Sequence, residues 1–155
     1  MRIRRAQLED VPGWLALAAE VESLFGPLVE DAEFHRALRK NIARGTAYCV
    51  REGDGPPGTP LAGGLLFSPR PPAYRLGWLA VAGGWRRRGV GRALVEHALG
   101  LVRPPAEIVV VTFGEDNAAG QPARRFYERL GFQPAEPAPA GPEGGSRQVY
   151  RRVIG

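Results

Sequence analysis

Cysteine is nearly absent from this chain, and histidine is scarce. Cys49 is the one cysteine, and the two histidines, His35 and His97, are scattered through the sequence. A single cysteine cannot form a disulfide within the chain, and ligands dispersed in this way do not predict a metal site. Cys49 lies in the strand-like run 46–51, where we expect a small buried thiol.

Long hydrophobic runs are also missing. Residues 1–19 place three arginines ahead of an apolar stretch, as a signal peptide does, but Glu9 and Asp10 interrupt that stretch. No run approaches the roughly 20 apolar residues that cross a bilayer as a helix. We therefore expect a cytoplasmic protein with no membrane partner.

Lysine is scarce as well. Lys40 is the only lysine, so the net charge of +5 and the pI near 10.1 come from arginine. Arginine favours bidentate contacts with phosphate and carboxylate groups. The charge is compatible with nucleic-acid binding or with an enzyme that holds a phosphorylated cofactor, and the cofactor is the simpler explanation. A P-loop is excluded, because it needs Gly-Lys-Ser/Thr.

The length and the composition predict one folded domain. Of the 155 residues, 44% are hydrophobic and 24% are charged, and no segment repeats. Strands and helices are predicted in alternation, which indicates an α/β fold with a mixed sheet and helices on both faces. The run 107–113 is apolar throughout, as in a strand buried on both faces. The predicted strands are 1–5, 46–52, 61–68, 74–81, 107–113, 132–133 and 146–152, and the predicted helices are 11–25, about 32–42, 90–102 and 122–130.

A strand, a turn and a helix are predicted between Leu76 and Leu101. The apolar run 79–81 leads through Gly83-Gly84 into the segment 86–92, which contains three consecutive arginines. A helix start carries unpaired backbone N–H groups and the positive end of the helix dipole. Glycines let a ligand approach these groups, so the segment predicts an anion site. A dinucleotide-binding loop would need a third glycine where Leu94 stands.

A second motif, A-x-x-F-Y-E-x-L-G-F, occupies residues 123–132. Its apolar residues recur at helical spacing and define one face: Ala123, Phe126, Tyr127 and Leu130. Gly131 lies where a C-terminal helix cap is expected. The spacing alone indicates only that these side chains pack into a core.

Together the two motifs resemble those of the GNAT superfamily of acyl-CoA-dependent N-acetyltransferases. The pattern R-x-x-G-x-G is similar to the family's pyrophosphate loop, and the run around Tyr127 is similar to its C-terminal motif. The resemblance implies one GNAT-like domain over residues 1–155, with a central pair of parallel strands that splay apart. It also implies acetyl-CoA as co-substrate and direct acetyl transfer to a primary amine in a ternary complex.

The resemblance also assigns cofactor contacts residue by residue. Pantetheine would lie along the strand formed by Leu79, Ala80 and Val81. The pyrophosphate would be held by Arg86, Arg87, Arg88, Gly89, Val90, Gly91 and Arg92. Tyr127 would reach the acetyl-CoA sulfur. Relatives often place a cofactor-contacting asparagine seven residues before this tyrosine, but here Gly120 occupies that position and Asn117 lies ten residues before it.

Tyr127 suits the role of general acid. A phenol has a reference pKa of about 10 and a thiol of about 8.5, so a neutral tyrosine can protonate a departing thiolate. Backbone N–H groups in the strand 79–81 could bond the thioester oxygen, as an oxyanion hole does.

The general base is not defined by the sequence. Many relatives place a glutamate on one of the two central strands, but here Tyr74 to Val81 contains no acid and Val109 to Phe113 contains none either. Glu115 and Asp116 lie just beyond the second strand and Glu22 ends the first helix, and each could equally be a surface or capping acid. Direct attack by amine that is already neutral needs no base.

The acceptor is indicated only by charge. In the family it enters between the first two helices and the loop before the last strand, here residues 20–33 and 134–145. The first segment has five acids and no basic residue, which favours a cationic amine. We expect no nucleic-acid partner and leave a homodimer open. A non-catalytic acyl-CoA-sensing or interaction module of the same fold is the alternative function.

Overall fold

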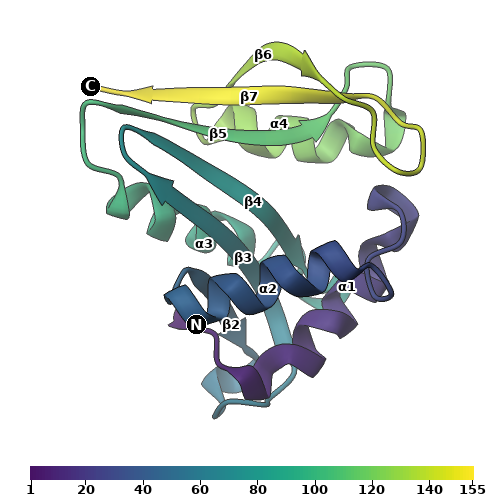
Figure 1. The fold of residues 1–155 in the computed structure, drawn as a ribbon, viewed down its shortest axis with the longest axis vertical. Helices are drawn as coiled ribbons and strands as arrows, with labels where there is room; N and C mark the ends of the chain where they lie inside the picture. Colours follow the sequence, from purple (N-terminus) through teal and green to yellow (C-terminus); the bar gives the residue numbers. More distant parts are fainter.

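The computed structural model describes residues 1–155 as one seven-stranded sheet with four α-helices (Figure 1). The strands, in the spatial order β1-β2-β3-β4-β5-β7-β6, are β1 (Arg4–Arg5), β2 (Ala47–Arg51), β3 (Leu61–Arg70), β4 (Ala73–Val81), β5 (Ala106–Phe113), β7 (Arg147–Ile154) and β6 (Gln133–Ala138). The helices are α1 (Val11–Phe25), α2 (Ala32–Arg44), α3 (Val90–Leu101) and α4 (Gln121–Arg129). None of them combines the length and the hydrophobicity that a bilayer crossing requires.

Strands β4 and β5 form the only parallel pair, and they separate part of the way along. Their register runs from Ala73 opposite Glu107 to Leu76 opposite Val110 and then stops. Strand β4 nevertheless continues to Val81, and β5 to Phe113. Figure 1 shows the two strands close together on the left and far apart on the right. The splayed parallel pair implied by the family resemblance is therefore confirmed.

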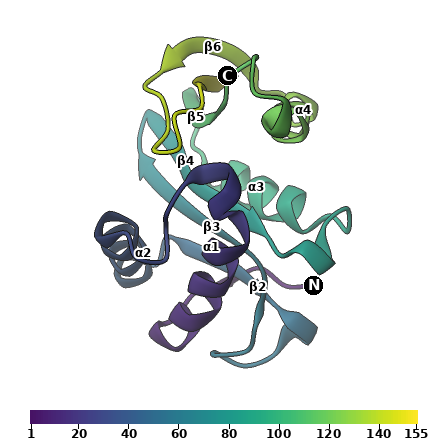
Figure 2. The ribbon, with the colours of Figure 1, turned by 90° about the vertical axis from the view of Figure 1, so that its right-hand side faces the viewer.

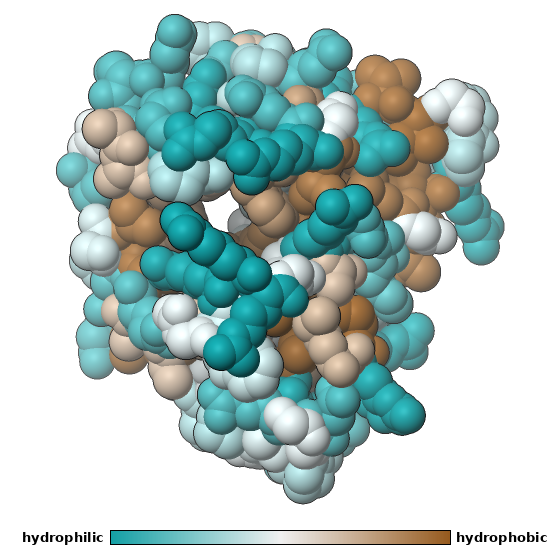
Figure 3. All heavy atoms as spheres, turned by 180° about the vertical axis from the view of Figure 1, so that it is seen from behind, coloured by the Kyte–Doolittle hydropathy of each residue, from teal (hydrophilic) through white to brown (hydrophobic).

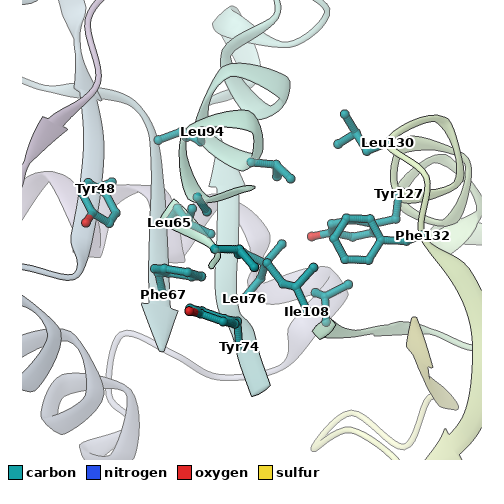
Figure 4. Close-up of a cluster of buried hydrophobic side chains, with 14 of the residues drawn as sticks. Tyr48, Leu65, Phe67, Tyr74, Leu76, Leu94, Ile108, Tyr127, Leu130 and Phe132 are labelled. Carbon is teal, nitrogen blue, oxygen red and sulfur yellow. The ribbon is translucent and has the colours of Figure 1, made fainter. Parts of the chain in front are cut away.

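Two hydrophobic cores lie on opposite faces of the sheet. Helices α3 and α4 cover one face, where the larger cluster of buried side chains lies (Figure 4). Helices α1 and α2 cover the other face, and Figure 2 shows α2 and α3 on opposite sides of the strands. Strand β2 serves both cores, because Tyr48 and Val50 face α3 while Ala47 and Cys49 face α1 and α2. Helices on both faces of a mixed sheet are therefore confirmed.

The prediction that residues 107–113 are buried on both faces is wrong. In β5 buried residues alternate with half-buried ones, and Glu107, Val109 and Val111 are only half-buried. The reason is that α1 and α2 pack over β2, β3 and β4, and the contact of α1 with β5 is made by its last residue, Phe25, with Phe113 at the end of the strand. A second difference concerns β6, which spans Gln133–Ala138 rather than 132–133. Its prolines are tolerated because β6 is an edge strand.

Asp10 immediately precedes α1, but its carboxylate does not cap that helix because it has other partners. It accepts hydrogen bonds from Arg51 Nε and Nη2 at 2.9 and 2.7 Å, and from the amides of Gln7 and Gly58 at 2.8 and 3.0 Å. Both charged side chains are buried, with 0% of Asp10 and 6% of Arg51 exposed. Burial alone would raise the pKa of Asp10, but these hydrogen bonds and the nearby guanidinium hold it below its ordinary value. The pair ties the start of α1 to the end of β2.

Cys49 is buried, as expected. Burial raises the pKa of its thiol to about 11, and the neighbouring Asp10 carboxylate adds to the increase. The thiol is therefore protonated at neutral pH and packs as a small apolar group.

Candidate functional site

The end of β4 has unpaired backbone groups on the side that faces β5. The amide of Ala82 donates to the carbonyl of Ala62 at 2.8 Å. The backbone N–H and C=O groups of the even-numbered residues at this end of β4 therefore point toward β3. Because this direction alternates along an antiparallel pair, the amides of Leu79 and Val81 point toward β5. Strand β5 is no longer paired with β4 at that level. The space-filling view of Figure 3 shows an opening through the molecule between its upper and lower parts.

The segment after β4 presents a row of free amides. It turns through a short 3-10 helix, Gly83–Trp85, and reaches α3 at Val90. No hydrogen bond within the chain uses the N–H of any residue in 86–92, and the first one in α3 runs from Ala93 to the carbonyl of Gly89. Arg87 and Gly89 have positive φ angles of 62° and 81°, which turn successive amides toward one another. This is the geometry of an anion site.

The arginine side chains of this loop are exposed and available. Arg86, Arg87 and Arg88 have no acidic partner, and the guanidinium of Arg88 lies 5.1 Å from the centre of the Trp85 ring. Arg92 pairs with Glu96 one turn further along α3, at 2.8 Å. The loop therefore combines fixed backbone dipoles with mobile positive charge.

Gly91 brings the two sequence motifs into contact. A Cβ atom at this position would lie 3.3 Å from the ring of Phe126, on α4, and 3.4 Å from Val81. The helix that starts at the arginine loop therefore packs closely against the helix that carries Tyr127. Absence of a side chain at residue 91 is what permits this approach.

Tyr127 is buried on the α4 side of the larger core. Only 6% of the residue is exposed, and its ring packs edge-to-face with Phe126 and Phe132 at 5.0 and 5.7 Å. In Figure 4 its hydroxyl points away from α4, toward the side of Leu76 and Ile108. Burial raises the pKa of Tyr127, so the phenol is protonated at neutral pH and carries a proton that it can donate.

Two residues that fix α4 against the sheet were missed by the sequence analysis. Arg124 is buried and donates to the carbonyl of Phe113 at 3.0 Å and to Gln148 Oε1 at 2.6 Å. Glu128 accepts a hydrogen bond from the hydroxyl of Tyr150 at 2.8 Å. Both residues lie close to Tyr127 in the sequence. Their partners on β5 and β7 are 11 to 24 residues away along the chain, so residue spacing could not predict these hydrogen bonds.

The base candidates differ in how free their carboxylates are. Oε2 of Glu22 accepts from the amides of Leu28 and Val29 at 2.8 and 3.1 Å, and these bonds lower its pKa. Asp116 accepts a hydrogen bond from the hydroxyl of Ser146. Glu115 is exposed and its carboxylate has no partner within the chain. Of the three, Glu115 is therefore the one with both oxygens free.

Asn117 is engaged by its own turn. Its Oδ1 accepts from the amide of Gly120 at 3.2 Å and so caps the short 3-10 helix Ala118–Gly120 that precedes α4. Contact between Asn117 and a cofactor stays a prediction.

The loop between α1 and α2 meets the loop between β6 and β7. The rings of Phe25 and Phe113 are 5.2 Å apart, and a Cβ at Gly26 would lie 3.2 Å from Pro142. Arg147, at the start of β7, is buried over the ring of Phe113 and pairs with Glu143 at 2.5 Å. Two segments expected to border an acceptor are thus brought together beside the splayed end of β5.

Most of the carboxylates in the acidic segment 20–33 already accept hydrogen bonds from backbone amides. Glu20 accepts from the amide of Gly83 at 2.9 Å, and Asp31 caps α2 by accepting from the amide of Glu33 at 3.0 Å. With Glu22 bound as described, three of the five acids hold backbone amides. Their charge is retained, but their main local function is to fix the loops around the splayed strands.

The structure thus combines a mixed sheet, a parallel pair that parts, and a helix start with unpaired amides, which is the arrangement that the family resemblance implies. A family model described as acetyltransferase (GNAT) domain matches residues 43–134. The chain therefore belongs to the GNAT acetyltransferase family.

Known relatives agree with this family. N-alpha-acetyltransferase 40 of Saccharomyces cerevisiae is 38% identical over 103 residues, which cover 56% of this chain and 35% of that protein. The match thus spans about a third of the yeast protein's length. A GNAT-family structure from Desulfovibrio desulfuricans superposes with a TM-score of 0.74 at 26% identity, covering 99% of each chain. Naa50 of Arabidopsis thaliana, solved with the bisubstrate analogue CoA-Ac-MVNAL, has a TM-score of 0.71 at 14% identity, covering 99% of this chain and 98% of the other.

Proposed function

We propose that this protein is an acetyl-CoA-dependent N-acetyltransferase in which residues 1–155 make one catalytic domain. The observation that carries the proposal is the row of unpaired amides at residues 86–92, which follows the part of β4 that has no parallel partner. The diphosphate of coenzyme A fits an anion site of this kind, with Arg86, Arg87 and Arg88 adding charge. The CoA-containing complex of the Arabidopsis neighbour supports the same ligand.

Each part of the site has a role in acetyl transfer. Acetyl-CoA supplies an activated acetyl thioester. The amides of Leu79 and Val81 would donate to its carbonyl oxygen from the open edge of β4, as an oxyanion hole does. Tyr127 would hold the proton that the thiolate leaving group takes. Glu115 would accept a proton from the amine directly or through water.

We further propose a protein N-terminal α-amine as the acceptor. The one acid on β4 and β5 is Glu107, which lies at the end where the two strands are paired and forms an ion pair with Arg151, so the splayed ends offer no strong base and the nucleophile must be neutral often enough by itself. An α-amine with a pKa of about 7.8 is roughly 10% neutral at pH 7, whereas a lysine amine with a pKa of about 10.4 is neutral roughly once in 2,500 molecules. The activity in the name of the yeast relative and the peptide-containing bisubstrate analogue bound to the Arabidopsis neighbour support the same acceptor class.

The proposal is tested in two stages. Calorimetry should show saturable acetyl-CoA binding, and Arg88→Ala with Gly89→Asp should abolish it. Arg125→Ala, which removes an exposed arginine from α4, is the matched control and should leave binding unchanged. Absence of binding to the wild type, or full binding by the double variant, would contradict the proposed cofactor site.

The second stage measures release of free CoA with two peptides. One has a free N-terminus and no lysine, and the other has a blocked N-terminus and one internal lysine. We expect turnover with the first peptide only. Preference for the lysine peptide would refute the α-amine assignment. Binding of acetyl-CoA without turnover on any amine would identify the non-catalytic module instead.

A further inference from the structure

A second basic surface lies on α2, on the other side of the sheet from the arginine loop. Arg36, Lys40 and Arg44 follow one another at four-residue spacing, so they form one stripe along the helix. An open hollow of about 740 Å³ lies between this stripe and the ends of β2 and β3. Arg70, at the tip of the β3–β4 hairpin, lines the hollow from the opposite side, and no acidic residue lines it.

These four cations have no partner within the chain. Arginines elsewhere do form ion pairs, for example Arg147 with Glu143 and Arg151 with Glu136. No ion pair involves any residue of the hollow: Arg36, Lys40, Arg44 or Arg70. Like charges four residues apart on a helix repel each other and destabilise it. The chain therefore keeps an unfavourable arrangement that a negatively charged partner would relieve.

The proposed cofactor site does not account for this charge. Figure 2 shows α2 and α3 on opposite sides of the strands, and the arginine loop belongs to the α3 side. Figure 1 shows that the C-terminal end of α2, where Arg44 lies, is at the opposite end from the loop that joins α1 to α2. A ligand held at residues 86–92 would not reach the hollow.

We infer that this surface binds the phosphate backbone of a nucleic acid. From Arg36 to Arg44 the helix advances about 12 Å, a distance over which one strand carries about three or four phosphates. Guanidinium groups match phosphate oxygens bidentately, and the half-buried Ser68 adds a free hydroxyl. One small anion would use only part of such a surface.

An anionic membrane is the other source of clustered phosphate, and the structure disfavours it. A helix that binds a bilayer needs a free apolar face to insert. The large apolar residues of α2 already pack against the sheet, with Phe34 6% and Leu38 0% exposed and Ile42 half-buried. The exposed side of α2 is polar, so it offers charge without an anchor.

Fluorescence anisotropy with a labelled RNA duplex of about 20 base pairs tests this inference at about 50 mM salt. Saturating CoA is added so that the arginine loop does not contribute. The test variant neutralises the stripe with Arg36→Gln, Lys40→Gln and Arg44→Gln. The control variant removes the same charge elsewhere, at three exposed and unpaired positions, with Arg103→Gln, Arg125→Gln and Arg129→Gln. Circular dichroism and acetyl-CoA calorimetry establish that both variants are folded.

The wild type should bind the duplex with a salt dependence that the stripe variant largely loses. Each lost phosphate contact lowers the slope of log K against log salt by about 0.9, so the slope should fall by about 2 to 3. The control variant should keep most of the slope. No binding by the wild type, equal losses in both variants, or binding only to phosphatidylserine vesicles and not to RNA would each overturn the inference. This outcome is independent of acetyl transfer, which is measured separately.

Discussion

Asp10→Ala should leave the guanidinium of Arg51 buried without its counter-ion. In the wild type, Asp10 is 0% and Arg51 6% exposed, and two charge-assisted bonds of 2.9 and 2.7 Å join them. The substitution also deprives the amides of Gln7 and Gly58 of their acceptor. No other acid hydrogen-bonds to Arg51, so the positive charge would remain in the protein interior.

The expected cost is about 3 to 5 kcal/mol, which is the usual effect of removing one partner from a buried ion pair. For a chain of this length, 1 kcal/mol corresponds to about 2 to 4 °C in Tm, so the midpoint should fall by about 6 to 20 °C. Urea denaturation and differential scanning calorimetry measure both quantities. Glu96→Ala, which breaks the exposed pair with Arg92, is the control and should leave the midpoint unchanged.

A double variant separates pairing from packing. Asp10→Ala with Arg51→Met removes both charges, so it should cost much less than the two single variants added together. The pKa of Asp10 is lowered in the folded protein, so its stabilising effect is fully present above its unfolded pKa of about 3.9 and is lost as the pH falls through the folded value. Additive effects, or a single-variant cost below about 1 kcal/mol, would refute the argument.

Three further predictions concern the site. Tyr127→Phe should keep the fold and the acetyl-CoA affinity but lower kcat by about 10²- to 10⁴-fold, because only the proton donor is lost. A kcat within a few-fold of wild type would show that Tyr127 serves only to pack the core. Glu22→Gln should leave kcat and its pH profile unchanged, because the carboxylate already accepts two amides, and a large fall in kcat would reinstate it as the base. Gly91→Val should weaken acetyl-CoA binding and lower Tm, because the new side chain would push against Phe126. Gly100 has open space around it, so Gly100→Ala is the control and should do neither. Equal acetyl-CoA affinities of the Gly91→Val variant and the wild type in calorimetry would show that the close contact is unnecessary.

The helices and most strands could be predicted because local patterns define them. The helix predicted at 90–102 is found at Val90–Leu101, and Asp31 caps α2 as its sequence position indicates. The arginine loop was also predictable, since an anion site at a helix start needs only a strand, glycines and a helix in succession. Its unpaired amides are then a direct consequence of helix geometry.

Features that depend on distant partners could not be predicted in the same way. Asp10 and Arg51 are separated by 41 residues, and neither side chain shows by itself that it will be buried. Glu22 was expected as a base or a surface acid, but the chain folds back so that it holds the amides of Leu28 and Val29. Whether one face of β5 is covered depends on where α1 and α2 end. The apolar sequence of β5 carries no information about the position of those helices.

The single parallel contact in the sheet also has a consequence for the order of folding. Strands β1 to β4 all precede Gly83 and strands β5 to β7 all follow Pro105, so the chain makes one side of the contact before the other. During synthesis from the N-terminus, β4 can pair with β3 at once but must wait for β5 on its other edge. An open strand edge is a site for association with other chains. The edge of β4 that is partly unpaired in the finished protein is therefore open along its whole length in the nascent chain, and there it is a site for misassembly.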